Sequence, residues 1–165
     1  MRYQKGVTVG KKLSKVDLAY IAGFLDGDGT IMAIIERHNE KKHKFRIRIF
    51  MEFSQQEKNI IVLEHLKKKI GSGSLTISNK RVFKLSIKDT VILERILPQL
   101  LLFTVIKKEQ IKIALKILAI RIKTRKDLIK VALLADKLSS LNLKSRSRRK
   151  NSSKIISEES FSRND

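Results

Sequence analysis

Two aspartates lie two positions apart in a short turn that also contains glycine. Asp26 and Asp28 alternate with Gly27 and Gly29, directly after an apolar stretch with helical spacing. Carboxylates at the C-terminal end of a helix face the negative end of its dipole, so they do not serve the fold. A hard cation such as Mg²⁺, however, takes carboxylate and carbonyl oxygens as ligands. The turn is therefore a candidate metal site, and the alternative is a solvated turn that leads into a strand.

The helical stretch before this turn contains an interior glycine. Gly23 costs ~1 kcal/mol relative to alanine at such a position. Ala19 and Ala22 lie close to it in the sequence. The three residues form a small-residue face on which a second backbone can approach closely, and we expect a helix–helix contact there.

Alternating periodicities predict the elements that position these residues. Helices are predicted at about 15–25, 57–70, 90–98, 107–122 and 125–141, and strands at 30–36, 45–53, 75–78 and 83–87. The order α-ββ-α-ββ-α-α-α predicts an α+β fold with two hairpins, each preceded by a helix. Basic segments without periodicity flank this part, so we divide the chain into an N-terminal arm (1–12), one domain (13–142) and a flexible basic tail (143–165).

The net charge of the chain indicates the class of molecule that it binds. Its 165 residues include 37 Lys and Arg against 16 Asp and Glu, a formal net charge of +21. A folded chain this basic is typical of nucleic-acid binding. Membrane binding would call for an amphipathic basic helix with bulky aromatics, whereas aromatics are 5% here and the basic residues are spread along the chain.

Other functional classes are excluded by composition. The chain has no cysteine, which removes disulfides, thiolate zinc sites and cysteine nucleophiles. Its first residues lack the apolar segment of a secretory signal. We therefore expect an intracellular protein with no membrane partner, in a prokaryotic cytoplasm or an organelle.

One face of the predicted sheet carries a mixture of donors, acceptors, hydroxyls and apolar groups. If the apolar faces of the strands pack on the helices, the opposite face presents Met32, Ile34, Glu36, Arg46, Arg48, Phe50, Glu52, Thr76, Ser78, Lys84, Ser86 and Lys88. Such a mixture suits contacts with base edges in a major groove, where donors, acceptors and thymine methyl groups all occur. An ordinary solvated sheet face is the alternative.

The segment from Ile21 to Gly29, IAGFLDGDG, resembles the nine-residue motif of the LAGLIDADG homing endonucleases. The predicted element order over about 14–140 is also similar to that of the family. The resemblance implies an α-β-β-α-β-β-α core with a four-stranded antiparallel, saddle-shaped DNA-binding sheet, here with extra C-terminal helices. A short chain with a single copy of the motif resembles the subclass of this family whose members work as homodimers.

The resemblance also implies roles for the residues of the motif. The motif helix packs against its twin in the dimer through Gly23 and its small neighbours. Asp28 matches the essential metal ligand of the family, and Gly27 supplies a backbone carbonyl to the same metal. Asp26 is a second acidic candidate that caps or orients the helix end.

Two further site residues follow from alignment with homodimeric members of the family. A glutamine at the end of the second strand falls on Gln55, and a lysine before a later helix falls on Lys107. Gln56 and Lys108 are the alternatives if the alignment slips by one residue. A basic residue of those members is replaced by Asn59, which is a departure from the family pattern.

These features predict an intron- or intein-associated endonuclease that uses Mg²⁺, with Mn²⁺ or Ca²⁺ able to substitute in binding. As a homodimer it would make a double-strand break in a long pseudo-palindromic DNA site and leave short 3′ overhangs. Two alternatives stay open: a maturase that binds intron RNA on the same fold, and a non-catalytic DNA-binding protein.

Overall fold

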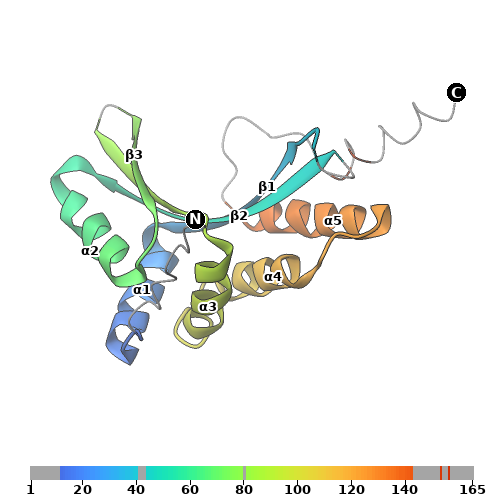
Figure 1. The fold of residues 1–165 in the computed structure, drawn as a ribbon. Coiled ribbons are helices and arrows are strands. Elements are labelled where there is room, and N and C mark those ends of the chain that lie inside the picture. The colour runs from blue at the N-terminus through green and yellow to red at the C-terminus, as the bar shows by residue number, and fades with distance from the viewer. Residues whose placement is uncertain (1–11, 41–43, 80, 143–152, 154–155, 157–165) are drawn as a thin grey trace, which may run out of the picture.

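The computed structural model describes residues 12–40, 44–79, 81–142, 153 and 156. The elements in chain order are α1 (Lys15–Asp28), β1 (Gly29–Arg37), β2 (Phe45–Gln56), a 3₁₀ turn (Glu57–Asn59), α2 (Ile60–Ile70), β3 (Ser74–Asn79), β4 (Val82–Ile87), α3 (Thr90–Leu100), α4 (Lys108–Ala119) and α5 (Arg125–Leu141). This confirms the predicted order and the α+β class. Figure 1 shows the helices gathered on one side of a curved sheet, whose other side is left open.

The four strands form one antiparallel sheet in the order β1-β2-β4-β3. Ile31, Met51 and Ile87 lie side by side in register and are fully buried against the helices. One position further along β2, Glu52 lies between Thr30 and Ser86 on the open face. The alternation predicted from the sequence therefore separates a helix-covered face from an open one.

α1 packs one face into the core and is longer than predicted. Ser14 caps its N-terminus in a capping box with Asp17, and the helix continues through Asp28 instead of ending at residue 25. The N–H of Gly29 donates to the carbonyl of Leu25 and closes the last turn. A Cβ at Gly29 would lie 2.7 Å from the Cα of Leu25, so only glycine allows this close exit into β1.

The helices after the sheet differ from the prediction at their ends. Asp89 caps α3 by accepting from the N–H of Ile92, and the helix continues past Pro98 to Leu100. α4 ends at Ala119, three residues earlier than predicted. No helix in the described ranges is long and apolar enough to cross a bilayer.

The two predicted flanking segments lie largely outside the described residues, apart from Lys12, Ser153 and Ile156. Ile156 is buried against Leu128 and Ala132 of α5. The N–H of Ser153 donates to Asp136 at 3.0 Å. At these two positions the segment predicted to be a flexible tail contacts α5, through the buried side chain of Ile156 and the N–H of Ser153.

Candidate functional site

The C-terminal end of α1 meets the end of β2 at a carboxylate–amide contact. Asp28, the last residue of α1, is exposed, and its Oδ2 accepts a 2.6 Å hydrogen bond from Nε2 of Gln55. The amide of Asn59 donates in turn to Oε1 of Gln55 at 3.2 Å. The neighbouring Gln56 belongs to the opposite face of the strand, paired with Val82. The structure therefore brings Gln55, and not Gln56, to Asp28.

Asp26, the other motif aspartate, has a different environment. Its Oδ2 accepts from the N–H of Val105 at 2.6 Å, and its Oδ1 accepts from Ile106 at 3.2 Å and Lys107 at 2.9 Å. Lys107 is the N-cap residue of α4, so the carboxylate of Asp26 lies at a helix N-terminus, where an anion is stabilised. Asp26 thus holds the loop that carries Lys107 against the turn that presents Asp28.

An ion pair fixes the other end of α1. Nζ of Lys69 in α2 lies 2.8 Å from Oδ1 of Asp17. The hydrogen bond from Lys69, together with those from Ser14, lowers the pKa of Asp17 to about 2 from its ordinary value of 3.8. α1 is therefore tied to α2 at its start and to the α3–α4 loop at its end, which fixes the direction in which Asp28 points.

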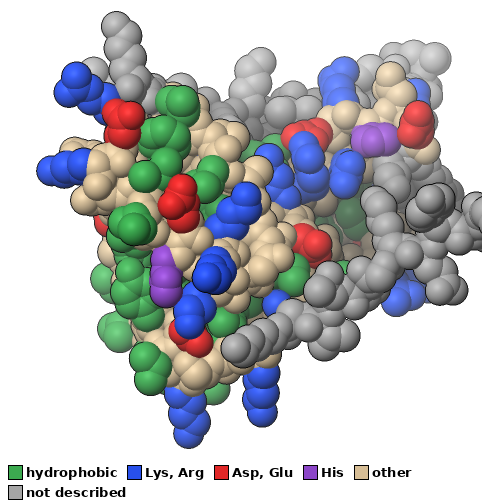
Figure 2. Space-filling model, turned by 60° about the vertical axis from the view of Figure 1, so that its left-hand side comes forward, with side chains coloured by type: hydrophobic (Ala, Val, Ile, Leu, Met, Phe, Trp, Pro, Cys, Tyr) green, Lys and Arg blue, Asp and Glu red, His purple; other side chains and the backbone are tan. Residues whose placement is uncertain are grey.

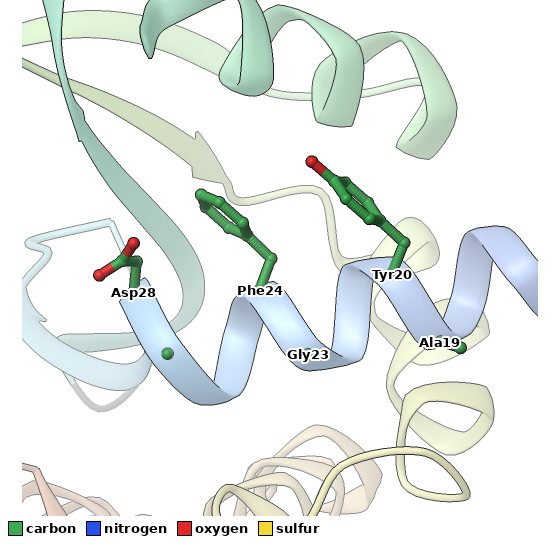
Figure 3. Close-up of a pocket in the computed structure, with 6 residues that line it drawn as sticks. Ala19, Tyr20, Gly23, Phe24 and Asp28 are labelled. Carbon is green, nitrogen blue, oxygen red and sulfur yellow. The ribbon is translucent and has the colours of Figure 1, made fainter.

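One face of α1 is left uncovered. Ala19, Tyr20, Gly23 and Gly27 are exposed and line a shallow hollow together with Phe24 and Asp28. Figure 3 shows Tyr20, Phe24 and Asp28 on the same side of the helix, beside the bare backbone of Gly23. A Cβ at Gly23 would meet no heavy atom within 4 Å. Within the described protomer, therefore, nothing requires glycine at this position.

The small-residue face differs from the prediction at one residue. Ala22 is fully buried and belongs to the protomer's own core, with Leu18, Ile21 and Leu25. Its assignment to a helix–helix contact was wrong, because a 3.6-residue repeat directs positions 18, 21, 22 and 25 inward. Ala19 and Gly23 remain on the outer face.

Most of the predicted sheet-face residues lie on the open face. Arg46, Thr76, Ser78 and Lys88 are exposed, and Met32, Ile34, Glu36, Arg48, Glu52 and Lys84 are partly exposed. Phe50 and Ser86 are buried, so their prediction as direct contacts is corrected. Ser86 donates to Glu52 at 2.6 Å, and Phe50 lies beneath longer side chains of the same face.

The open face is basic but its charges are partly paired. Nη2 of Arg48 contacts both carboxylate oxygens of Glu36 on the neighbouring strand. Figure 2 shows Lys and Arg side chains across the visible side of the molecule, with few acidic groups among them. Arg37 at the end of β1, and Lys44 and Arg81 directly before β2 and β4, are exposed basic residues.

The open face is larger than predicted. β2 extends to Gln56 instead of ending at residue 53, β1 begins at Gly29 and β3 begins at Ser74. By register, the additional residues of the open face are Thr30, Ser54, Gln56 and Ser74. Ser54 and Gln56 continue the alternation of Arg46, Arg48, Phe50 and Glu52, and this signal could have found them.

The donor set at Asp28 fits a hard cation only in part. The exposed carboxylate of Asp28 and a helix-terminal carbonyl such as that of Gly27 are oxygen ligands of the kind that Mg²⁺ takes. Among the described residues, no group of three or more His, Cys, Asp or Glu side chains gathers to hold a metal. One protomer therefore presents one exposed carboxylate, that of Asp28, as a candidate metal ligand at this position.

Comparison with known proteins agrees with the resemblance to the LAGLIDADG endonucleases. The sequence model of the LAGLIDADG endonucleases matches residues 21–115, more than half of the chain. DNA endonuclease I-CvuI of Chlorella vulgaris is 28% identical over 130 residues, 77% of this chain and 80% of that protein. DNA endonuclease I-CreI of Chlamydomonas reinhardtii is 31% identical over 107 residues, 65% of each chain.

Solved structures of I-CvuI share the fold. One contains its DNA target with Ca²⁺ and superposes with a TM-score of 0.78 at 25% identity, covering 87% of this chain and 92% of that chain. Another contains the I-CreI target, uncleaved, with Mg²⁺; its TM-score is 0.77 at 26% identity, covering 88% and 94%. The motif, the fold and these similarities together show that the chain belongs to the LAGLIDADG endonuclease family.

Proposed function

We propose that this protein is a homing endonuclease that works as a homodimer and makes a metal-dependent double-strand break in duplex DNA. The observation that carries the proposal is the Asp28–Gln55 contact at the exposed end of the motif helix. The relatives named as DNA endonucleases, and the complexes of one of them with DNA in Mg²⁺ or Ca²⁺, support it.

The chemistry would be divided among four residues. Asp28 and the backbone carbonyl of Gly27 would hold Mg²⁺, and the amide of Gln55 would orient the carboxylate and a nearby water. Lys107, placed by Asp26, would stabilise negative charge on the scissile phosphate. The metal, when bound, supplies an activated water and charge neutralisation in phosphodiester hydrolysis.

Dimerisation would complete this site. Each protomer offers one such carboxylate, and its α1 leaves Ala19, Gly23 and Gly27 exposed along one face, on which a second backbone can approach. Two copies packed through this face would place two Asp28 carboxylates near one axis. One carboxylate would then serve each DNA strand, which yields a double-strand break.

The open sheet would bind the target. Strands of about eight residues at ~3.3 Å per residue span ~26 Å, so a dimer would cover on the order of 20 bp. Twofold symmetry implies a pseudo-palindromic site, and basic residues at the sheet edges imply binding that weakens steeply with salt. We also propose that cleavage leaves short 3′ overhangs and that the endonuclease is associated with an intron or an intein.

The test is the Asp28→Asn variant in a cleavage selection on randomised duplex DNA with Mg²⁺. We expect wild-type protein to select one pseudo-palindromic site and Asp28→Asn to lose cleavage, while its DNA affinity stays within about tenfold, because most affinity comes from phosphate contacts. Asp89→Asn is the matched control, since asparagine also caps a helix. Cleavage by Asp28→Asn at the wild-type rate would refute the site assignment.

A further inference from the structure

An aromatic side chain is buried on the polar face of the sheet. Phe50 is 4% exposed, yet it belongs to neither hydrophobic cluster of the described residues. Its neighbours Ile49 and Met51 point into the main core. Alternation along β2 directs Phe50 to the open face, opposite Met32 of β1. The helix-covered core therefore does not account for its burial.

Two cations lie over this ring. The guanidinium carbon of Arg48 is 5.5 Å from the ring centroid, and Nζ of Lys88 is 5.3 Å from it. Arg48 is two residues away on the same strand, whereas Lys88 follows the last residue of β4. Both distances are within the range of a cation–π interaction. One ring thus contacts basic groups from two adjacent strands.

The position of Arg48 is further defined on its other side. The carboxylate of Glu36 on β1 pairs with its Nη2, while its Nε is buried without a hydrogen-bond partner among the described residues. The guanidinium is therefore held between a carboxylate and an aromatic face. Long basic side chains otherwise lose many rotamers when they bind, and fixing them beforehand reduces that entropic cost.

We propose that Phe50 is a positioning residue that holds Arg48 and Lys88 as one base-contacting unit across β1, β2 and β4. This inference rests on the proposed function, because it assumes that the open face contacts DNA bases. The ring itself is covered and touches no base. Its effect is on sequence preference, and it changes neither the number of phosphate contacts nor the chemistry at Asp28.

Phe50→Leu removes the aromatic face and keeps an apolar side chain, whereas Phe50→Tyr keeps the aromatic face. In the cleavage selection, we expect Phe50→Leu to lose about fivefold or more of the discrimination at the base pairs that Arg48→Ala and Lys88→Ala also relax. Good base contacts contribute about 1–3 kcal/mol each, so a loss of this size is measurable. Phe50→Tyr should retain the preference, and adding Phe50→Leu to the double variant Arg48→Ala/Lys88→Ala should cause little further loss at those base pairs.

Two further measurements separate positioning from general destabilisation. In the free protein, the ε-methylene proton signals of Lys88 should be shifted upfield by the ring in wild type and Phe50→Tyr, but not in Phe50→Leu. The slope of log affinity against log salt should be the same in all three proteins. Ile49→Val, a core change on the opposite face, is the control and should leave the base preference unaltered.

The outcomes distinguish this inference from the proposed function. If Arg48→Ala alters the base preference and Phe50→Leu does not, the positioning role is refuted and the endonuclease proposal stands. If Phe50→Leu relaxes all positions equally and lowers stability as Ile49→Val does, the ring has only a structural role. If wild-type protein selects no duplex site, the proposed function fails and this inference fails with it.

Discussion

At the scale of single residues, the two motif aspartates have different environments. Asp28 is exposed and bonded to one amide, whereas Asp26 accepts three backbone N–H groups from the α3–α4 loop. An oxygen committed to a backbone donor is a poor candidate for a metal ligand. The geometry therefore favours one metal-binding carboxylate and one positioning carboxylate in each protomer.

Gln55→Ala tests the residue that touches Asp28. We expect single-turnover cleavage to fall by on the order of 10–100-fold, as is typical for the loss of a hydrogen-bond partner that orients a metal ligand, while DNA affinity changes little. Gln56→Ala is the comparison, because its side chain belongs to the open face of β2 and should change DNA affinity more than the single-turnover rate at saturating DNA. A larger loss in Gln56→Ala than in Gln55→Ala would show that the alternative alignment is correct.

At the scale of elements, α1 is held at both ends by long-range contacts. Lys69 of α2 pairs with Asp17 at its start, and the loop before α4 donates to Asp26 near its end. Neither contact uses a side chain that would perform the chemistry, because Lys107 donates to Asp26 through its backbone N–H. They fix the helix whose last residue is Asp28, and their loss should change the geometry of the site before it changes the fold.

Asp26→Asn tests the second of these contacts. Hydrogen bonds to a charged acceptor contribute about 1.5–3 kcal/mol, so we expect a lower free energy of unfolding and slower cleavage together. Asp127→Asn weakens a comparable carboxylate at the start of α5, which accepts from the N–H of Thr124. That control should lose stability in denaturant titrations without loss of cleavage rate; equal rates in the two variants would contradict the positioning role of Asp26.

The Asp17–Lys69 contact predicts a pH dependence. Because the folded protein lowers the pKa of Asp17 from 3.8 to about 2, the unfolded state binds the proton first as pH falls. The stabilisation is fully present above about pH 3.8 and is lost as pH falls through 2. The difference in unfolding free energy between wild type and Asp17→Asn, measured in denaturant at a series of pH values, should decline over this window. A difference that persists below pH 2 would exclude this titration as its cause.

At the scale of the whole molecule, two uncovered surfaces remain after the core is built. One is the open face of the sheet, and the other is the outer face of α1 with Ala19, Tyr20 and Gly23. They are joined at Asp28, where α1 ends and β1 begins. In the proposed complex, DNA covers the first surface and a second copy covers the second, so the site lies where the two partners meet.

Gly23→Leu tests the second surface. In a lone protomer the new side chain enters open space, and leaving glycine should stabilise the helix by up to ~1 kcal/mol. In a dimer packed through α1 it overpacks the contact, at a cost of about 1–3 kcal/mol per site. We expect at least about tenfold weaker dimerisation in sedimentation equilibrium, with cleavage reduced in parallel. Ala119→Leu, at an exposed position of α4, is the control; an unchanged assembly state in both variants would exclude this interface.

The sequence alone determined the element order and the division of each element into two faces. Period two along 45–53 and the 3.6-residue spacing of Leu128, Val131, Ala132, Ala135 and Leu138 are local patterns. The register of β2 confirms the first, although Phe50 on the open face is buried too, and burial of all five residues confirms the second. A local pattern also located the acidic turn. The helical spacing of Leu18, Ile21, Ala22 and Leu25 places Ala22 inward as well, although its small size had suggested a helix–helix contact.

Only the tertiary structure decided which groups meet. Gln55 reaches Asp28 across 27 positions, and Asp26 reaches Lys107 across 81 positions. The burial of Phe50 and the attachment of Ile156 to α5 likewise depend on neighbours that are remote in sequence or come from other elements. Periodicity reports the environment of a residue relative to its own helix or strand. The direction and distance between elements come from packing, and the chemistry of this site depends on both.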